Sequence, residues 1–389
     1  MLPVVQPKTS KEGTAMRLTS RALLVAQGSV ALLALVLLLH IRVAAAQQAR
    51  VDYAAQAKEA VFVAKDFAFV SGERLPELRV NYATWGQPKR DPTGKITNAI
   101  LLCHGTMGSW RSFAGSWWAA NMFGAGQPLD TGKYFVIASD SIGTGKSSKP
   151  SDGLRMSFPR YRLDDVVQGQ KRLLAEALDV RELVAVIGVS YGGRQAWQWA
   201  VQYPEAMRGV VPLISSPFPN AGRRGMQDFL PAEVITSDPT WNNGAYATQP
   251  RNFPLAIMMF DLSLDGAGHL WDVAPTREQS FSYLPKATQQ QVSAWDANDF
   301  VYQMRVNDGF DAYRDLNRVK ARVLMINMAG DGMVPAELGH AEKVLATLGP
   351  RADYVLVKEA SDYGHRAVGQ TVTVYAPKIG EFLQRLASE

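Results

Sequence analysis

A serine between glycines is the residue of this chain best placed to do chemistry. Ser190 lies in the run Gly-Val-Ser-Tyr-Gly-Gly over 188–193, with an apolar segment, 183–187, before it and a helix-forming segment, 194–201, after it. A G-x-S-x-G turn between a strand and a helix strains the serine backbone and lifts the hydroxyl clear of the sheet. The pattern predicts a nucleophile that attacks a carbonyl carbon, and a chance Gly-Ser-Gly loop is the alternative.

A serine hydroxyl needs a histidine to take its proton and a carboxylate to orient that histidine. Of five histidines, only His365 lies in a loop directly after the last predicted strand, where such a base belongs. Asp331 follows the preceding strand, which gives the chain order serine, acid, histidine. We predict Ser190, Asp331 and His365 as a catalytic triad. Asp362 is the rival acid, and a helix cap or turn is the structural alternative for Asp331.

The tetrahedral intermediate of acyl transfer needs two backbone N–H donors, one of them from the residue after the nucleophile. Tyr191 holds that position, and the turn 104–108 (His-Gly-Thr-Met-Gly) follows the strand expected to supply the second donor. We predict Thr106 for this donor, with Met107 as the alternative. No histidines or carboxylates have metal-ligand spacing, and 143–147 lacks the gap of a phosphate-binding loop, so no metal and no cofactor are expected.

The elements that must position these residues alternate between strand and helix. One predicted helix spans 163–178, with acidic residues in its first turn, as the helix dipole favours. This alternation predicts an α/β fold with a mostly parallel central sheet and helices on both faces. The predicted strands cover 61–70, 78–84, 99–103, 134–138, 183–187, 209–214, 321–327 and 354–357.

A segment without strand patterns interrupts the alternation. Residues 215–311 are rich in Met, Trp, Phe and Pro, which predicts an inserted helical cap over the carboxyl edge of the sheet; extra core helices far from the site are the alternative. The predicted organisation is therefore a core first part at 47–214, the cap at 215–311 and a core second part at 312–389.

The first 46 residues resemble an export signal. Arg17 and Arg21 precede an apolar run, 22–39, and three alanines at 44–46 offer a cleavage site, with Met16 as an alternative start. We expect export to the periplasm or medium, or membrane anchoring if this leader is not cleaved.

Charge and cysteine content exclude some partners. Residues 1–46 hold five Lys and Arg against one Glu, so they carry +4 of the formal +5 and leave +1 for the remainder. We therefore expect no nucleic-acid partner, and contact with a membrane only through the leader. The lone Cys103 allows no internal disulfide. The expected partner is a small acyl substrate; the oligomeric state is open, with a homodimer among the arrangements considered.

Further motifs extend beyond the elbow. They are 80–86 (Val-Asn-Tyr-Ala-Thr-Trp-Gly), 98–104 (Asn-Ala-Ile-Leu-Leu-Cys-His), 128–131 (Pro-Leu-Asp-Thr), Tyr203-Pro204, Asp238-Pro239 and 296–298 (Asp-Ala-Asn). With the elbow they resemble the homoserine O-acetyltransferase branch of the α/β-hydrolase superfamily, from about residue 60 to the end. The resemblance implies the α/β-hydrolase fold, the same triad, and acetyl transfer to homoserine.

The chain departs from that family's pattern. Tyr191 and Val189 stand where the family usually has Met and Gly, and Ala232 stands where our alignment places an arginine associated with the substrate carboxylate. Arg223, Arg224 or Arg251 could substitute from nearby.

The predicted function combines the triad, the leader and the cap. We predict an exported serine hydrolase that cleaves a carboxylic ester or related acyl bond through an acyl-serine intermediate. The aromatic and Met content of the cap favours an apolar acyl or alcohol group. An acyltransferase with the same triad is the main alternative, followed by a peptidase and by a non-catalytic binding protein.

Overall fold

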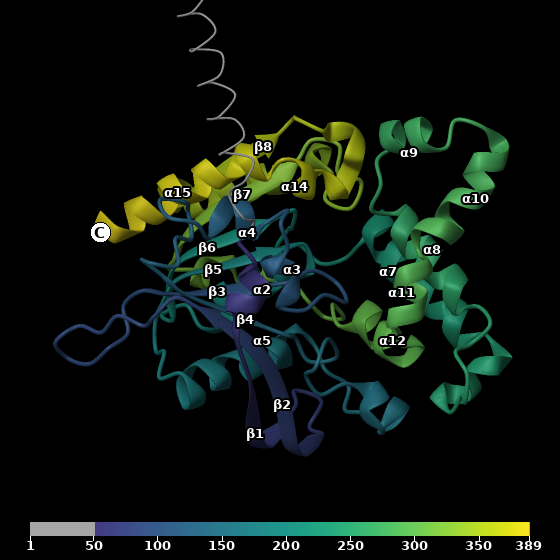
Figure 1. Ribbon diagram of the computed structural model, residues 1–389, viewed down its shortest axis with the longest axis horizontal. Coiled ribbons are helices and arrows are strands. Elements are labelled where there is room, and N and C mark those ends of the chain that lie inside the picture. The colour runs from purple at the N-terminus through teal and green to yellow at the C-terminus, as the bar shows by residue number, and fades with distance from the viewer. Residues whose placement is uncertain (1–50, 389) are drawn as a thin grey trace, which may run out of the picture. The chain divides into compact units, whose positions relative to one another are not determined.

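The computed structural model describes residues 51–388, and within them eight strands form a single sheet (Figure 1). β2 runs antiparallel to both of its neighbours, and the remaining pairs, from β4 to β8, are parallel. The mostly parallel sheet is as predicted. In spatial order the strands are β1 (Lys58–Ala68), β2 (Arg74–Trp85), β4 (Phe135–Ser139), β3 (Ala99–Cys103), β5 (Leu183–Val189), β6 (Met207–Leu213), β7 (Arg322–Met328) and β8 (Ala352–Val357).

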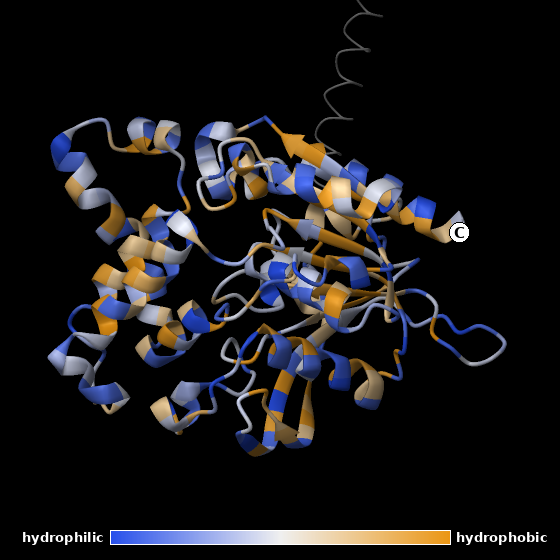
Figure 2. Cartoon of the chain, turned by 180° about the vertical axis from the view of Figure 1, so that it is seen from behind, coloured by the Kyte–Doolittle hydropathy of each residue, from blue (hydrophilic) through white to orange (hydrophobic). Residues whose placement is uncertain are grey.

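The central strands are apolar throughout because both faces of the sheet are covered. In β3 every residue is buried: Leu101 and Cys103 face one core layer, and Ile100 and Leu102 face the other. Figure 2 shows the hydrophobic colour running along these strands, while the covering helices carry polar residues on their outer sides.

Helices cover both faces of the sheet. α5 (Leu163–Arg172) and α6 (Tyr191–Gln202) contribute to one core layer, and α15 (Val372–Ser388) contributes Ile379, Phe382 and Leu383 to the other. The predicted helix at 163–178 is α-helical to Arg172 and continues as a π-helical turn over Leu173–Ala177. The remaining helices of this part are α2 (Tyr53–Gln56), α3 (Arg111–Ala114), α4 (Ala119–Met122), α13 (His340–Leu348) and α14 (Ala367–Gln370).

Six helices stand between β6 and β7, where the sequence predicts a cap; we call residues 215–311 the helical insert. Its own apolar cluster includes Ile235, Phe253 and Phe300, and it also takes in Met333 and Val334 from the loop after β7. The domain boundaries at 214 and 311 remain a prediction. The six are α7 (Gly222–Thr236), α8 (Phe253–Leu262), α9 (Ala267–Val273), α10 (Arg277–Ala287), α11 (Gln289–Ala294) and α12 (Ala297–Arg305).

The first two strands begin earlier than hydrophobic patterning indicates. β1 starts at Lys58 and β2 at Arg74, because the two strands pair as an antiparallel ribbon along their whole length, and most side chains at both starts are exposed and show no hydrophobic alternation. The predicted leader, residues 1–46, lies outside the described residues.

Candidate active site

The chain turns sharply at Ser190, between the end of β5 and the start of α6. The serine backbone has φ 58° and ψ −115°, a strained conformation for a residue with a side chain. A Cβ at Gly188 would lie 1.9 Å from the carbonyl oxygen of Gly192, and one at Gly192 would lie 1.8 Å from that of Cys103. Only glycine fits at both positions, so the predicted elbow is present.

Two loops bring the other candidate residues to Ser190. Asp331 follows β7, and His365 lies in the 3-10 segment Ser361–Arg366 after β8. His365 Nε2 lies 2.7 Å from Ser190 Oγ, and His365 Nδ1 lies 2.7 Å from Asp331 Oδ2. Both the imidazole and the carboxylate are buried. The fold thus brings together, in one hydrogen-bonded line, three residues separated by up to 175 positions.

Asp331 is anchored from its other side. Its Oδ1 accepts hydrogen bonds from the backbone N–H groups of Met333 at 2.8 Å and Val334 at 3.2 Å. The rival acid, Asp362, is exposed and its side chain lies against Gly268 of the insert. The geometry at His365 therefore favours Asp331 over Asp362.

The turn predicted to hold an oxyanion lies beside the elbow. An ideal Cβ on Gly105 would come within 3.8 Å of Ser190 Cβ, and Thr106 lines the same cavity as Ser190. Met107, the alternative donor, has φ 54°, so this turn is strained too. Tyr191 begins α6, where the first N–H groups of a helix have no intrahelical partner.

His104 supports this turn, a role that the sequence analysis missed. Its Nε2 accepts the N–H of Ser141 at 3.0 Å, so its proton sits on Nδ1 and is donated to the carbonyl of Gly105 at 2.8 Å. Burial lowers the pKa of His104, which keeps the ring neutral. The position of His104 directly before the turn was the sequence signal that could have indicated this role.

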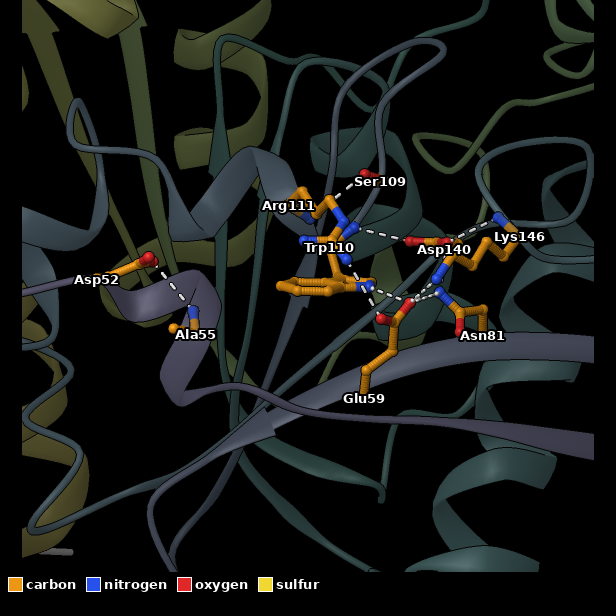
Figure 3. Close-up of polar contacts among 9 residues, drawn as sticks. All are labelled: Asp52, Ala55, Glu59, Asn81, Ser109, Trp110, Arg111, Asp140 and Lys146. Atoms are coloured by element: carbon orange, nitrogen blue, oxygen red, sulfur yellow. Dashed lines mark hydrogen bonds and ion pairs between the residues drawn. The ribbon is translucent and has the colours of Figure 1, made fainter.

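Asp140 joins the same turn to the neighbouring loop (Figure 3). Its carboxylate accepts the backbone N–H of Trp110 at 2.7 Å, the N–H of Lys146 at 3.0 Å and the side-chain amide of Asn81 at 2.8 Å. Glu59 lies next to this group and accepts from Lys146 Nζ at 2.9 Å. The glycine-rich loop 139–148 thus holds the segment after β3 in place.

A cavity of about 530 Å³ opens above Ser190. Thr106, Asp261 and Arg366 place polar groups on its wall. The volume lies in the range of small-molecule sites. Most of its larger side chains are apolar: Phe113, Trp117, Phe260, Leu264, Trp295 and Val368.

A second, small cavity of about 10 Å³ lies on another side of Ser190, and Arg194 and Arg224 line it. Arg194, one turn into α6, is buried, and burial followed by the charge of Arg224 lowers its pKa to about 9. Of the three arginines that could substitute for the family's arginine, Arg223, Arg224 and Arg251, Arg224 lines this cavity. Ala232 is buried in the insert core and lines neither cavity at Ser190. Sequence reasoning missed Arg194.

Within residues 51–388, no group of three or more His, Cys, Asp or Glu side chains could hold a metal ion. Two other histidines of the described residues have partners away from the elbow: His340 Nδ1 lies 3.0 Å from Ser216 Oγ, and the ring of His269 stacks on Tyr363.

Known proteins match most of this chain. A family model described as "alpha/beta hydrolase fold" matches residues 98–365. The homoserine O-acetyltransferase of Pasteurella multocida is 32% identical over 345 residues, covering 80% of this chain and 93% of the relative. The corresponding enzyme of Caulobacter vibrioides is 32% identical over 344 residues, covering 76% and 86%.

Solved structures agree with this grouping. Homoserine O-acetyltransferase from Bacillus anthracis has a TM-score of 0.75 at 25% identity and covers 84% of this chain and 97% of that one. Esterase E22 has a TM-score of 0.75 at 21% identity, with 84% and 100% covered, which shows a shared fold.

These relatives overturn one prediction. The expectation of an exported or membrane-anchored protein is wrong, because the relatives that match most of this chain are homoserine O-acetyltransferases. That expectation depended on the apolar run within residues 1–46, which lie outside the described part of the chain. In residues 51–388 no helix is long and apolar enough to cross a membrane.

Proposed function

Because the chain belongs to the α/β-hydrolase fold family, in its homoserine O-acetyltransferase branch, we propose that it is an acyltransferase that passes an acyl group from Ser190 to a hydroxyl-bearing acceptor. Homoserine is the acceptor named for the relatives, and we propose it or a similar hydroxy amino acid here. The observation that carries the proposal is the hydrogen-bonded line from Ser190 through His365 to Asp331.

The proposed chemistry starts with the histidine tautomer. Asp331 accepts the Nδ1 proton of His365, which leaves Nε2 as the acceptor facing the serine hydroxyl. Ser190 Oγ attacks the carbonyl carbon of a thioester or ester donor while His365 takes the serine proton. The oxyanion of the tetrahedral intermediate accepts hydrogen bonds from the backbone N–H groups of Tyr191 and Thr106. When the intermediate collapses, His365 returns the proton to the leaving group, and the acyl group stays on Ser190.

The second half repeats the steps with the acceptor. His365 removes the proton of the acceptor hydroxyl, whose oxygen attacks the acyl-serine, and the serine leaves with that proton. Arg194 and Arg224 support an acceptor with a carboxylate, because both line the small cavity that touches Ser190 and His365. Arg224 is partly neutralised by Asp228 at 2.5 Å, whereas Arg194 has no carboxylate at ion-pair distance among the described residues.

Hydrolysis, with water as the acceptor, is the second candidate. The observation in its favour is the apolar lining of the 530 Å³ cavity, which suits an ester with a sizeable apolar group. The buried Ala232, in place of the family's arginine, points in the same direction.

One experiment separates the two candidates. The protein is supplied with acetyl-coenzyme A and homoserine, and O-acetylhomoserine and free thiol are quantified together. Equal amounts of both support transfer; thiol without O-acetylhomoserine supports hydrolysis in its place.

The nucleophile is tested separately with p-nitrophenyl acetate. We expect Ser190→Ala to lower kcat by about 10⁴-fold or more, as triad deletions do in other serine enzymes. Undiminished turnover in the folded variant would contradict the role of Ser190, and with it both candidate functions.

A further inference from the structure

Arg366 directly follows His365 and reaches into the helical insert. Its Nη2 donates to Asp261 Oδ1 at 2.5 Å, and its Nε lies 2.9 Å from Asp265 Oδ1. Asp261 belongs to the last turn of α8, and Asp265 lies in the connection from α8 to α9. One guanidinium group therefore ties the loop that carries the histidine to two positions of the insert.

The backbones of the two segments also touch. A Cβ at Gly266 would lie 2.2 Å from the carbonyl oxygen of Asp362, and a Cβ at Gly364 would lie 2.7 Å from the nitrogen of Gly266. The N–H of Arg366 donates to the carbonyl of Leu264 at 3.3 Å. These contacts make the bridge a close, specific junction between the insert and the histidine loop.

The ion pairs of this junction are shielded from water. The side chains of Asp261 and Asp265 are 5% and 1% exposed, whereas that of Arg366 is 37% exposed at the cavity wall. Burial raises the pKa of Asp265, and the charge of Arg366 opposes that rise. A guanidinium group is planar and can bind two carboxylates in fixed directions. The two ion pairs therefore fix the position of the Arg366 backbone.

We propose that Arg366 is a positioning residue: its bridge to Asp261 and Asp265 makes the placement of His365 against Ser190 depend on the helical insert. The proposal rests on the proposed function, since it concerns the same histidine. His365 has 2.7 Å contacts on both ring nitrogens, and a shift of its loop would lengthen both. Misplacement of a catalytic group by about 1 Å can cost roughly 100-fold in rate.

Three variants test the bridge. Arg366→Met keeps the apolar stem and removes the charge; Arg366→Lys keeps the charge without the planar fork. The triple variant Asp261→Asn, Asp265→Asn, Arg366→Met removes all the charges, so it leaves no buried carboxylate unpaired. Arg172→Gln is the matched control, because Arg172, the last residue of α5, contacts Glu176 through two nitrogens and lines neither cavity at Ser190.

Each folded variant is assayed for its rate of labelling by a fluorophosphonate and for kcat and KM with p-nitrophenyl acetate. We expect Arg366→Met and the triple variant to lose roughly 10- to 100-fold in labelling rate and kcat, with KM within about twofold. Arg366→Lys should lie between them and the wild type, and Arg172→Gln should equal the wild type.

A structural role alone would lower the unfolding temperature without changing the labelling rate of the folded protein. Wild-type labelling rates in Arg366→Met, or a loss confined to KM, would overturn the proposal. If Arg366→Met fails to fold, the triple variant and Arg366→Lys decide by the same criteria. A wild-type protein that is not labelled at all would instead refute the proposed function.

Discussion

The orientation of one side chain makes the substitution Asp331→Asn unusually informative. Oδ1 of Asp331 accepts two backbone N–H groups, from Met333 and Val334, and Oδ2 accepts from His365. An asparagine must keep its carbonyl oxygen toward the two N–H donors, because its NH₂ group cannot accept a hydrogen bond. The NH₂ group then faces His365 Nδ1 and donates to it.

This reversal forces the wrong tautomer on the histidine. Nδ1 becomes an acceptor, the proton moves to Nε2, and Nε2 can no longer take the proton of Ser190 at 2.7 Å. In serine enzymes with this arrangement the same change lowers kcat by about 10⁴-fold, which corresponds to about 5.4 kcal/mol of barrier. Since the amide matches the carboxylate in shape, the fold should be retained.

The assay is the release of p-nitrophenol from p-nitrophenyl acetate, with the unfolding temperature measured alongside. Asp362→Asn is the matched control, because that carboxylate is exposed and lies three residues from His365 in the same loop. We expect the control to keep its activity. The reasoning is refuted if folded Asp331→Asn stays within about tenfold of the wild type, or if Asp362→Asn loses as much as Asp331→Asn.

Two further predictions concern packing and pH. Gly192→Ala should give insoluble or inactive protein, because its Cβ would lie 1.8 Å from the carbonyl oxygen of Cys103; Gly169→Ala, whose nearest atom lies at 3.6 Å, is the control and should stay active. Burial raises the pKa of Asp299 to about 7, although the carboxylate accepts from Ser151. Between about pH 4 and pH 7, the folded protein therefore holds a proton on Asp299 that the unfolded chain does not. The free energy of unfolding falls as the pH rises through that window. Asp299→Asn should remove this dependence, and melting curves parallel to those of the wild type from about pH 5 to about pH 8 would contradict it.

Local patterns were sufficient to predict most strands and the candidate residues. The apolar run before Ser190 and the glycines around it specify a strand and a tight turn, because a Cβ at Gly188 would meet the carbonyl oxygen of Gly192, only four residues along the chain. The meeting of Ser190, Asp331 and His365 could be predicted because the carboxyl ends of parallel strands lie at one edge of the sheet. The exposed ribbon of β1 and β2 could be predicted less well, since its polar ends have no hydrophobic period.

The sequence by itself therefore determined the elbow, the parallel sheet and the three residues that meet at its edge. The elbow and the strands depend on steric limits and hydrophobic periodicity, which act over a few neighbouring residues, and the three residues meet because each follows the end of a parallel strand. Only the tertiary structure decided that Arg194 and Arg224 share a cavity with Ser190, that His104 and Asp140 hold the turn beside it, and that Arg366 bridges to the insert. Each of these contacts joins side chains from separate elements, and their meeting depends on how the helices pack and not on any local pattern.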